Sequence, residues 1–146
     1  MEKLAEIIVR YNPVVRLADC PVITGSKDAY ELFMKNWNED ISFRESFYVM
    51  YLTKANRVKG ISLISMGGLD STIADRKLIF ATALKTLSNS IILAHNHPSG
   101  NLKPSNPDIS LTRKVRDCGD ILDIKVLDHL IITTEGYYSF ADEGML

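Results

Sequence analysis

Cysteine is scarce in this chain, and its scarcity excludes several kinds of site. The 146 residues include two cysteines, Cys20 and Cys118, and no Cys-x-x-Cys pair. Two isolated cysteines provide neither a disulfide framework nor a cysteine-rich zinc site, so we expect reduced thiols in a reducing compartment. The His-x-Glu and Cys-x-x-Cys pairs of the zinc nucleobase deaminases are also absent, which excludes that class of enzyme.

A charge excess and long apolar runs are missing as well. The net charge is −1, so the chain lacks the basic footprint of a dedicated nucleic-acid-binding protein. No apolar stretch approaches the ~18 residues of a membrane span, and the first residues lack the pattern of a signal peptide. We therefore expect a cytoplasmic protein with no membrane association. With a hydrophobic fraction of 46%, the chain is long enough to bury the core of one domain.

The segment from His95 to Asp108 carries the clearest chemical pattern. His95 and His97 end an aliphatic run, residues 91–94, that we interpret as a buried strand. Residues i and i+2 of a strand point to the same face, so both imidazoles can converge on one point. Asp108 adds a carboxylate across a loop rich in Gly, Pro and Ser. Two imidazoles and one carboxylate, with room for a water, form the ligand set of a catalytic zinc.

Asp108 also has a purely structural interpretation. Ser105-x-x-Asp108 has the spacing of a reciprocal helix cap, with Pro107 in the first helical turn. The two interpretations are compatible, because a helix N-terminus is a good place to fix a ligand.

The spacing of these residues resembles the JAMM (MPN+) metalloprotease motif. The run His-Asn-His-Pro-Ser-Gly, followed by Pro-Ser-x-x-Asp and later by Asp128-His129, resembles the RadC branch of that superfamily. The resemblance extends from about Thr24 to the C-terminus, so we expect residues 1–23 to be a leader packed on an MPN catalytic domain of residues 24–146. The family also has a glutamate just before an upstream strand, and Glu45 is the residue that matches it. On residues alone, Glu45 would be a solvated charge at a strand start.

The resemblance implies a fold and an activity. The fold would be the three-layer MPN fold of the JAB/cytidine-deaminase-like type, an α/β class with a mixed central sheet flanked by helices. The activity would be that of a zinc-dependent metallopeptidase, which hydrolyses a peptide or isopeptide amide of a peptide or protein substrate. His95, His97 and Asp108 would hold Zn²⁺. Glu45 would be the general base, and the Ser105 hydroxyl would donate to the oxyanion.

Two other functions stay open at this point. Members of the RadC branch carry a DNA-repair label, and longer members have a helix-hairpin-helix segment that we do not expect in this chain. A metal-free MPN module that only binds partners is the second alternative. The complete motif argues against a metal-free module, because a module that only binds partners does not need all five of its residues. These are Glu45, His95, His97, Ser105 and Asp108.

Apolar periodicity supports the α/β class independently. Helices are expected from an N-cap at Ser26 to about Trp37, after an N-cap at Asp75, and from Asp108 to about Leu122. Strands are expected over residues 46–52, 57–65, 125–134 and 137–140. Asp128 and His129 interrupt the third of these strands. They form either a hydrogen-bonded pair or a partner that orients a ligand histidine.

Overall fold

The computed structural model describes residues 1–67 and 74–146 of the chain. In chain order, the elements within these ranges are η1 (Leu17–Asp19), α1 (Ser26–Asn36), β1 (Ser46–Leu52), β2 (Val58–Met66), α2 (Arg76–Lys85), β3 (Ser90–Asn96), α3 (Asn106–Leu122), β4 (Lys125–Thr133) and β5 (Gly136–Ser139). In the same ranges, every helix is too short or too polar to cross a lipid bilayer.

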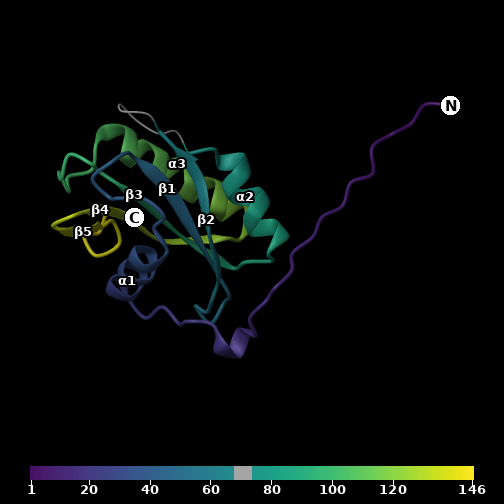
Figure 1. The fold of residues 1–146 in the computed structure, drawn as a ribbon, viewed down its shortest axis with the longest axis horizontal. Coiled ribbons are helices and arrows are strands. Elements are labelled where there is room, and N and C mark those ends of the chain that lie inside the picture. Colours follow the sequence, from purple (N-terminus) through teal and green to yellow (C-terminus); the bar gives the residue numbers. More distant parts are fainter. Residues whose placement is uncertain (68–73) are drawn as a thin grey trace.

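The five strands form one mixed sheet in the order β2-β1-β3-β4-β5 (Figure 1). β3 and β4 are parallel, and the other neighbouring strands are antiparallel. A parallel pair needs a crossover connection, which α3 provides. The β3-α3-β4 unit therefore places the carboxyl end of β3 near the start of α3, the kind of position where open α/β sheets bind ligands.

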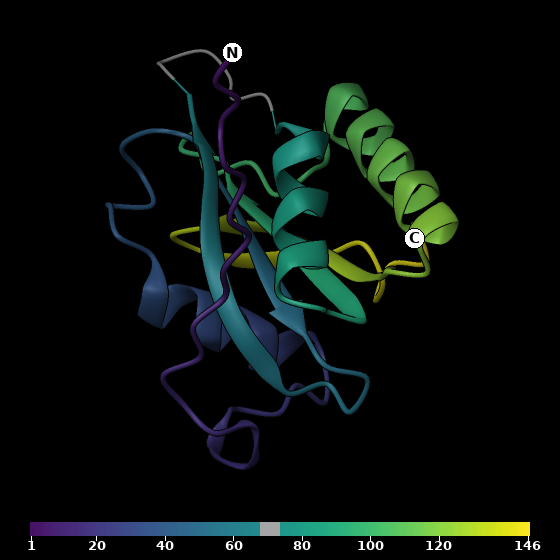
Figure 2. The same ribbon diagram turned by 90° about the vertical axis from the view of Figure 1, so that its right-hand side faces the viewer.

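Helices cover both faces of the sheet, which confirms the expected α/β class and layered architecture (Figures 1 and 2). α1 packs on one face, where Phe33 joins a buried cluster with Tyr48. α2 and α3 cover the other face, where Ile79 and Val115 join a cluster with Val49. Tyr48 and Val49 are successive residues of β1 and therefore belong to opposite faces. Every residue of β1 and β3 is buried, as expected for strands covered on both sides.

The first helix begins differently from the sequence-based expectation. Gly25, not Ser26, occupies the N-cap position, and no side chain caps the helix there. The Ser26 hydroxyl instead donates to Asp142 and lies 3.0 Å from the hydroxyl of Tyr137. The Ser26 hydroxyl therefore bonds to residues near the C-terminus instead of capping the helix, and local sequence does not reveal such distant partners.

The leader makes fewer contacts than expected. Residues 1–19 are exposed and extend away from the sheet in Figure 1. Within residues 1–23, only Cys20 and Ile23 are buried. Residues 1–19 are therefore not buried against the domain, and the division of the chain into residues 1–23 and 24–146 stays a prediction.

Candidate metal centre

Four side chains that the sequence singles out meet at the carboxyl end of β3. His95 is the penultimate residue of β3, and His97 follows the strand directly. Asp108 lies in the first turn of α3, and Glu45 immediately precedes β1. One nitrogen or oxygen atom from each of the four lies within 4.8 Å of the others. The fold thus gathers these groups from three separate segments of the chain.

The two histidines and the aspartate are in direct contact. Nε2 of His95 lies 2.9 Å from Nε2 of His97 and 3.2 Å from Oδ1 of Asp108. Oδ2 of Asp108 lies 3.1 Å from Nε2 of His97, whereas Oε1 of Glu45 is 3.9 Å from Nε2 of His95. Around a tetrahedral zinc ion, neighbouring donor atoms are about 3.3 Å apart. The triangle of His95, His97 and Asp108 therefore matches the size of a cation site, with Glu45 at its edge.

A backbone carbonyl determines which ring nitrogen of His97 carries the hydrogen. Nδ1 of His97 lies 2.6 Å from the carbonyl oxygen of Asn101. A carbonyl oxygen can only accept, so Nδ1 of His97 is the donor. In the neutral imidazole, Nε2 then has a lone pair that faces Asp108 and His95.

A buried chain of side chains imposes the same tautomer on His95. The hydroxyl of Thr112 donates to the carbonyl oxygen of Asp108 at 2.7 Å, so its oxygen accepts from Nδ1 of His129 at 2.6 Å. Nε2 of neutral His129 is then an acceptor, and it lies 2.7 Å from Nδ1 of His95. His95 therefore carries its hydrogen on Nδ1 and presents an unprotonated Nε2 to the centre.

Burial and ring stacking keep this chain in place. Full burial lowers the pKa of His129 well below its ordinary value, so the ring stays neutral as an acceptor must. Phe140 stacks on His129 with ring centroids 4.8 Å apart, and Phe47 stacks on His95 at 5.9 Å. The orientation of both imidazoles is thus fixed by packing as well as by hydrogen bonds.

The nitrogen and oxygen atoms that meet in this cluster require a positive charge between them. Two unprotonated Nε2 atoms 2.9 Å apart, next to a carboxylate, repel one another unless a positive charge lies between them. Burial opposes ionisation of Asp108, but its bonds with His95 and His97 outweigh burial, so the pKa of Asp108 is strongly lowered. Burial likewise lowers the pKa of His97, but its bonds with Asp108 and Asn101 outweigh burial and leave that pKa raised. A proton or a metal ion can supply the missing charge, and imidazole and carboxylate ligands suit a divalent transition metal.

We expect the metal-free protein to lose stability as the pH falls below about 6.5, because the pKa of His129 is lowered by folding. The unfolded chain gains a proton near pH 6.5 and the folded chain does not, so the stability from neutral His129 is present above that pH and is lost below it. The loss reaches at most about 1.4 kcal/mol per pH unit. The raised pKa of His97 changes the free energy of unfolding only above pH 6.5, so it does not contribute to the loss below that pH.

Denaturant unfolding in the presence of a chelator, at several pH values from about 7 to about 5, measures this slope. His129→Gln should remove most of it. A wild-type protein whose free energy of unfolding is constant below pH 6.5 would show that His129 is not held neutral.

Ser105 has a structural partner in the same turn. Its hydroxyl oxygen accepts from the backbone N–H of Asp108 at 3.1 Å, and its own N–H donates to Oδ2 of Asp108 at 2.8 Å. The expected capping box is therefore confirmed. This cap also turns the Asp108 carboxylate toward the histidines. The capping bond uses the hydroxyl of Ser105 as an acceptor and does not consume its proton.

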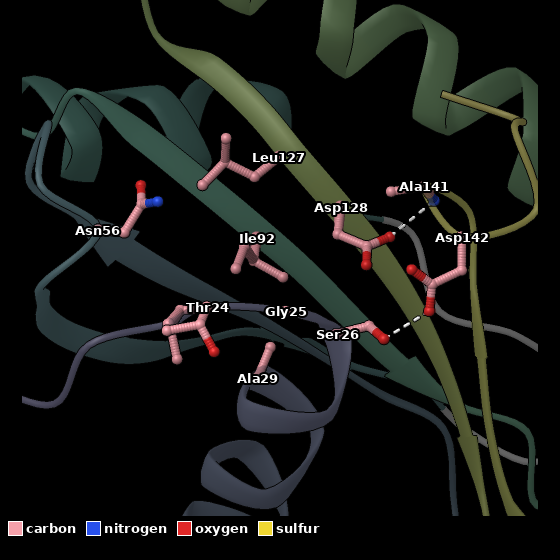
Figure 3. Close-up of a pocket in the computed structure, with 11 residues that line it drawn as sticks. Thr24, Gly25, Ser26, Ala29, Asn56, Ile92, Leu127, Asp128, Ala141 and Asp142 are labelled. Atoms are coloured by element: carbon pink, nitrogen blue, oxygen red, sulfur yellow. Dashed lines mark hydrogen bonds between the residues drawn. The ribbon is translucent and has the colours of Figure 1, made fainter.

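Asp128 and His129 do not form a side-chain pair, because they point to opposite faces of β4. The Asp128 carboxylate accepts from the Ser139 hydroxyl at 2.6 Å and from the backbone N–H of Ala141 at 3.0 Å. It lines a cavity of about 220 Å³ between β4 and the start of α1, beside Asp142 (Figure 3). None of the four residues of the metal centre lines this cavity. Of these two residues, His129 is the one whose side chain contacts His95 of the candidate metal centre.

Two residues of this arrangement were missed by sequence reasoning. Thr112 follows Asp108 by four positions, so both lie on one face of α3, and this spacing was a usable signal. Asn96 lies between the two histidines and contacts an irregular segment, which no periodic pattern could have indicated.

Comparisons with known proteins show relatives over most of the chain. A family model of the RadC-like JAB domain matches residues 23–145. The chain is 45% identical over 123 residues to a UPF0758 protein of Flavobacterium johnsoniae, which covers 84% of this chain and 53% of that protein. It is 43% identical over 140 residues to a UPF0758 protein of Desulfitobacterium hafniense, covering 94% and 58%. The chain thus spans a little over half the length of these relatives.

Proposed function

Because the chain belongs to the RadC-like JAB domain family, we propose that it is a zinc-dependent hydrolase that cleaves peptide or isopeptide amide bonds. The observation that carries this proposal is the meeting of Glu45, His95, His97 and Asp108 within 4.8 Å. The hydrogen bonds behind both histidines support it, because they direct unprotonated nitrogens into the cluster.

The ligand types favour zinc over the other common divalent ions. Mg²⁺ and Ca²⁺ prefer oxygen ligands, whereas two imidazoles and one carboxylate suit Zn²⁺. Three protein ligands also leave one tetrahedral position open, which distinguishes catalytic from structural zinc sites. A zinc ion held by His95, His97 and Asp108 would act as a Lewis acid that lowers the pKa of water in the open position to roughly 7.

Glu45 is the residue that moves protons in the proposed reaction. Its side chain is 17% exposed and borders the ligand triangle, so both a water and a substrate can reach it. Glu45 accepts a proton as water adds to the amide carbonyl carbon, then transfers that proton to the leaving nitrogen as the C–N bond breaks. The Ser105 hydroxyl donates a hydrogen bond to the carbonyl oxygen while negative charge develops on it.

The experiment that tests this function combines metal analysis with a search for cleaved amides. We expect one equivalent of zinc per chain after loading, and new amine termini in a mixture of peptides and lysine-linked isopeptides. Cleavage should stop with a chelator and return with zinc. A protein that holds less than about half an equivalent of zinc, with none restored by addition, would contradict the proposal. Salt-dependent binding to duplex DNA without cleavage would favour the DNA-repair alternative.

Removing the acceptor behind His95 should weaken zinc binding. We expect His129→Leu to lower zinc affinity about 10- to 100-fold, because Nδ1 of His95 then loses its partner and the tautomer is no longer fixed. His129→Gln places an amide oxygen near the lost Nε2 and should recover most of the affinity. Competition with a chromogenic chelator measures both. Equal affinities for the wild type and His129→Leu would refute an orienting role for His129.

A further inference from the structure

Asn96 is buried completely between two side chains that point the other way. It is the last residue of β3, and its neighbours His95 and His97 face the metal centre. Strand alternation sends the Asn96 side chain to the opposite side of the sheet, toward the segment that precedes β1. The residue between the histidines therefore cannot act as a ligand, and its role must come from what it contacts.

Three hydrogen bonds tie the Asn96 amide to the segment that carries Glu45. Its nitrogen donates to the carbonyl oxygens of Ile41 and Arg44 at 2.7 and 2.8 Å. Its oxygen accepts from the backbone N–H of Ser46 at 2.7 Å. Arg44 and Ser46 are the two neighbours of Glu45, so one side chain holds the backbone on both sides of the proposed general base.

The strand register explains why a side chain is needed at this position. β1 and β3 are paired from Leu52↔Ser90 to Phe47↔His95, which is the last pair of the ladder. The next step would set Ser46 against Asn96, and there the Asn96 side chain, instead of its backbone, takes the Ser46 N–H. Beyond Phe47 the segment is no longer paired with β3, and the Asn96 side chain links its backbone to that strand.

We propose that Asn96 is a positioning residue that fixes the Glu45 carboxylate relative to His95 and His97. This assignment rests on the proposed hydrolase function. Asparagine suits the task because it offers two donors and one acceptor on a short side chain. Aspartate has no hydrogen to give to the two carbonyls, and alanine leaves two carbonyls and one N–H buried without this partner.

The test uses Asn96→Ala and Asn96→Asp in the zinc-loaded protein. We expect kcat to fall about 10- to 100-fold, because a displacement of about 1 Å costs that much, while KM and zinc affinity change less than about threefold. Amide hydrogen exchange should rise in residues 41–46 and stay unchanged in residues 95–108. In a Glu45→Gln background, Asn96→Ala should lower the residual rate less than about twofold, since there is no carboxylate left to position.

Tyr51→Phe is the matched control for a general loss of stability. It removes a different buried hydrogen bond from β1, that of the Tyr51 hydroxyl to the carbonyl oxygen of Ile79 at 3.0 Å. This variant should be less stable than the wild type but keep its kcat.

Three results would overturn the assignment. The first is a kcat within about threefold of the wild type in Asn96→Ala, and the second is an equal loss of rate with and without the Glu45 carboxylate. The third is a loss of zinc that matches the loss of rate, which would make Asn96 a support for the ligands. A wild-type protein that binds zinc and cleaves nothing contradicts the hydrolase function itself, and with it this role for Asn96. That failure is recognised before any variant is made.

Discussion

Glu45→Gln should bind zinc as tightly as the wild type and cleave amides about 10²- to 10⁴-fold more slowly. Glutamine keeps the size of the side chain and removes its charge and its ability to accept a proton. The triangle of His95, His97 and Asp108 is unchanged by this substitution, since Glu45 lies at its edge. The rate should therefore fall without a loss of metal, which separates proton transfer from metal binding.

The matched control is Glu135→Gln, which removes the same charge from an exposed turn between β4 and β5. Zinc content by elemental analysis and cleavage rate at saturating substrate are measured for both variants. The assignment of Glu45 as general base fails if Glu45→Gln retains more than about a tenth of the wild-type rate. It fails in a different way if the zinc is lost, because Glu45 would then be a ligand.

Asp108→Asn should lower zinc affinity at least about 100-fold, which is more than the loss expected when a residue that hydrogen-bonds to a ligand is substituted. The substitution removes the anionic ligand but keeps an oxygen that can accept from the Ser105 N–H, so the helix cap survives. The helix should therefore remain intact in the metal-free protein, as far-ultraviolet circular dichroism would show. This separates the ligand role of Asp108 from its capping role.

Asp117→Asn supplies the comparison, since Asp117 is an exposed carboxylate on the same helix. Its zinc affinity, measured by chelator competition, should equal that of the wild type. If Asp108→Asn binds zinc within about threefold of the wild type, Asp108 is a capping residue and not a ligand.

The parts of the fold that follow from local sequence were predicted well. The apolar run after Glu45 predicted β1 with the bounds that the structure has, and Asp75 caps α2 as expected. The cap formed by Ser105 and Asp108 was equally readable, because it depends on residues three positions apart. His95 and His97 could be placed on one face because strand alternation needs only the two of them.

The contacts that hold the site depend on how distant segments pair, and local patterns do not determine this. His129 meets His95 because β4 lies parallel to β3, with Leu93 opposite His129. Alternation in β4 separates Asp128 from His129 but does not say which of them faces the histidines. The Asn96 contacts involve an irregular segment, where no period applies.

The most direct test of the metal centre is the anomalous diffraction of zinc-loaded crystals at the zinc absorption edge. We expect one strong peak about 2.0–2.1 Å from Nε2 of His95, from Nε2 of His97 and from an oxygen of Asp108, with the Glu45 carboxylate facing the remaining position. A peak at any other place, or a zinc ion bound through Nδ1 of either histidine, would contradict the proposed centre and the hydrogen-bond chain behind it.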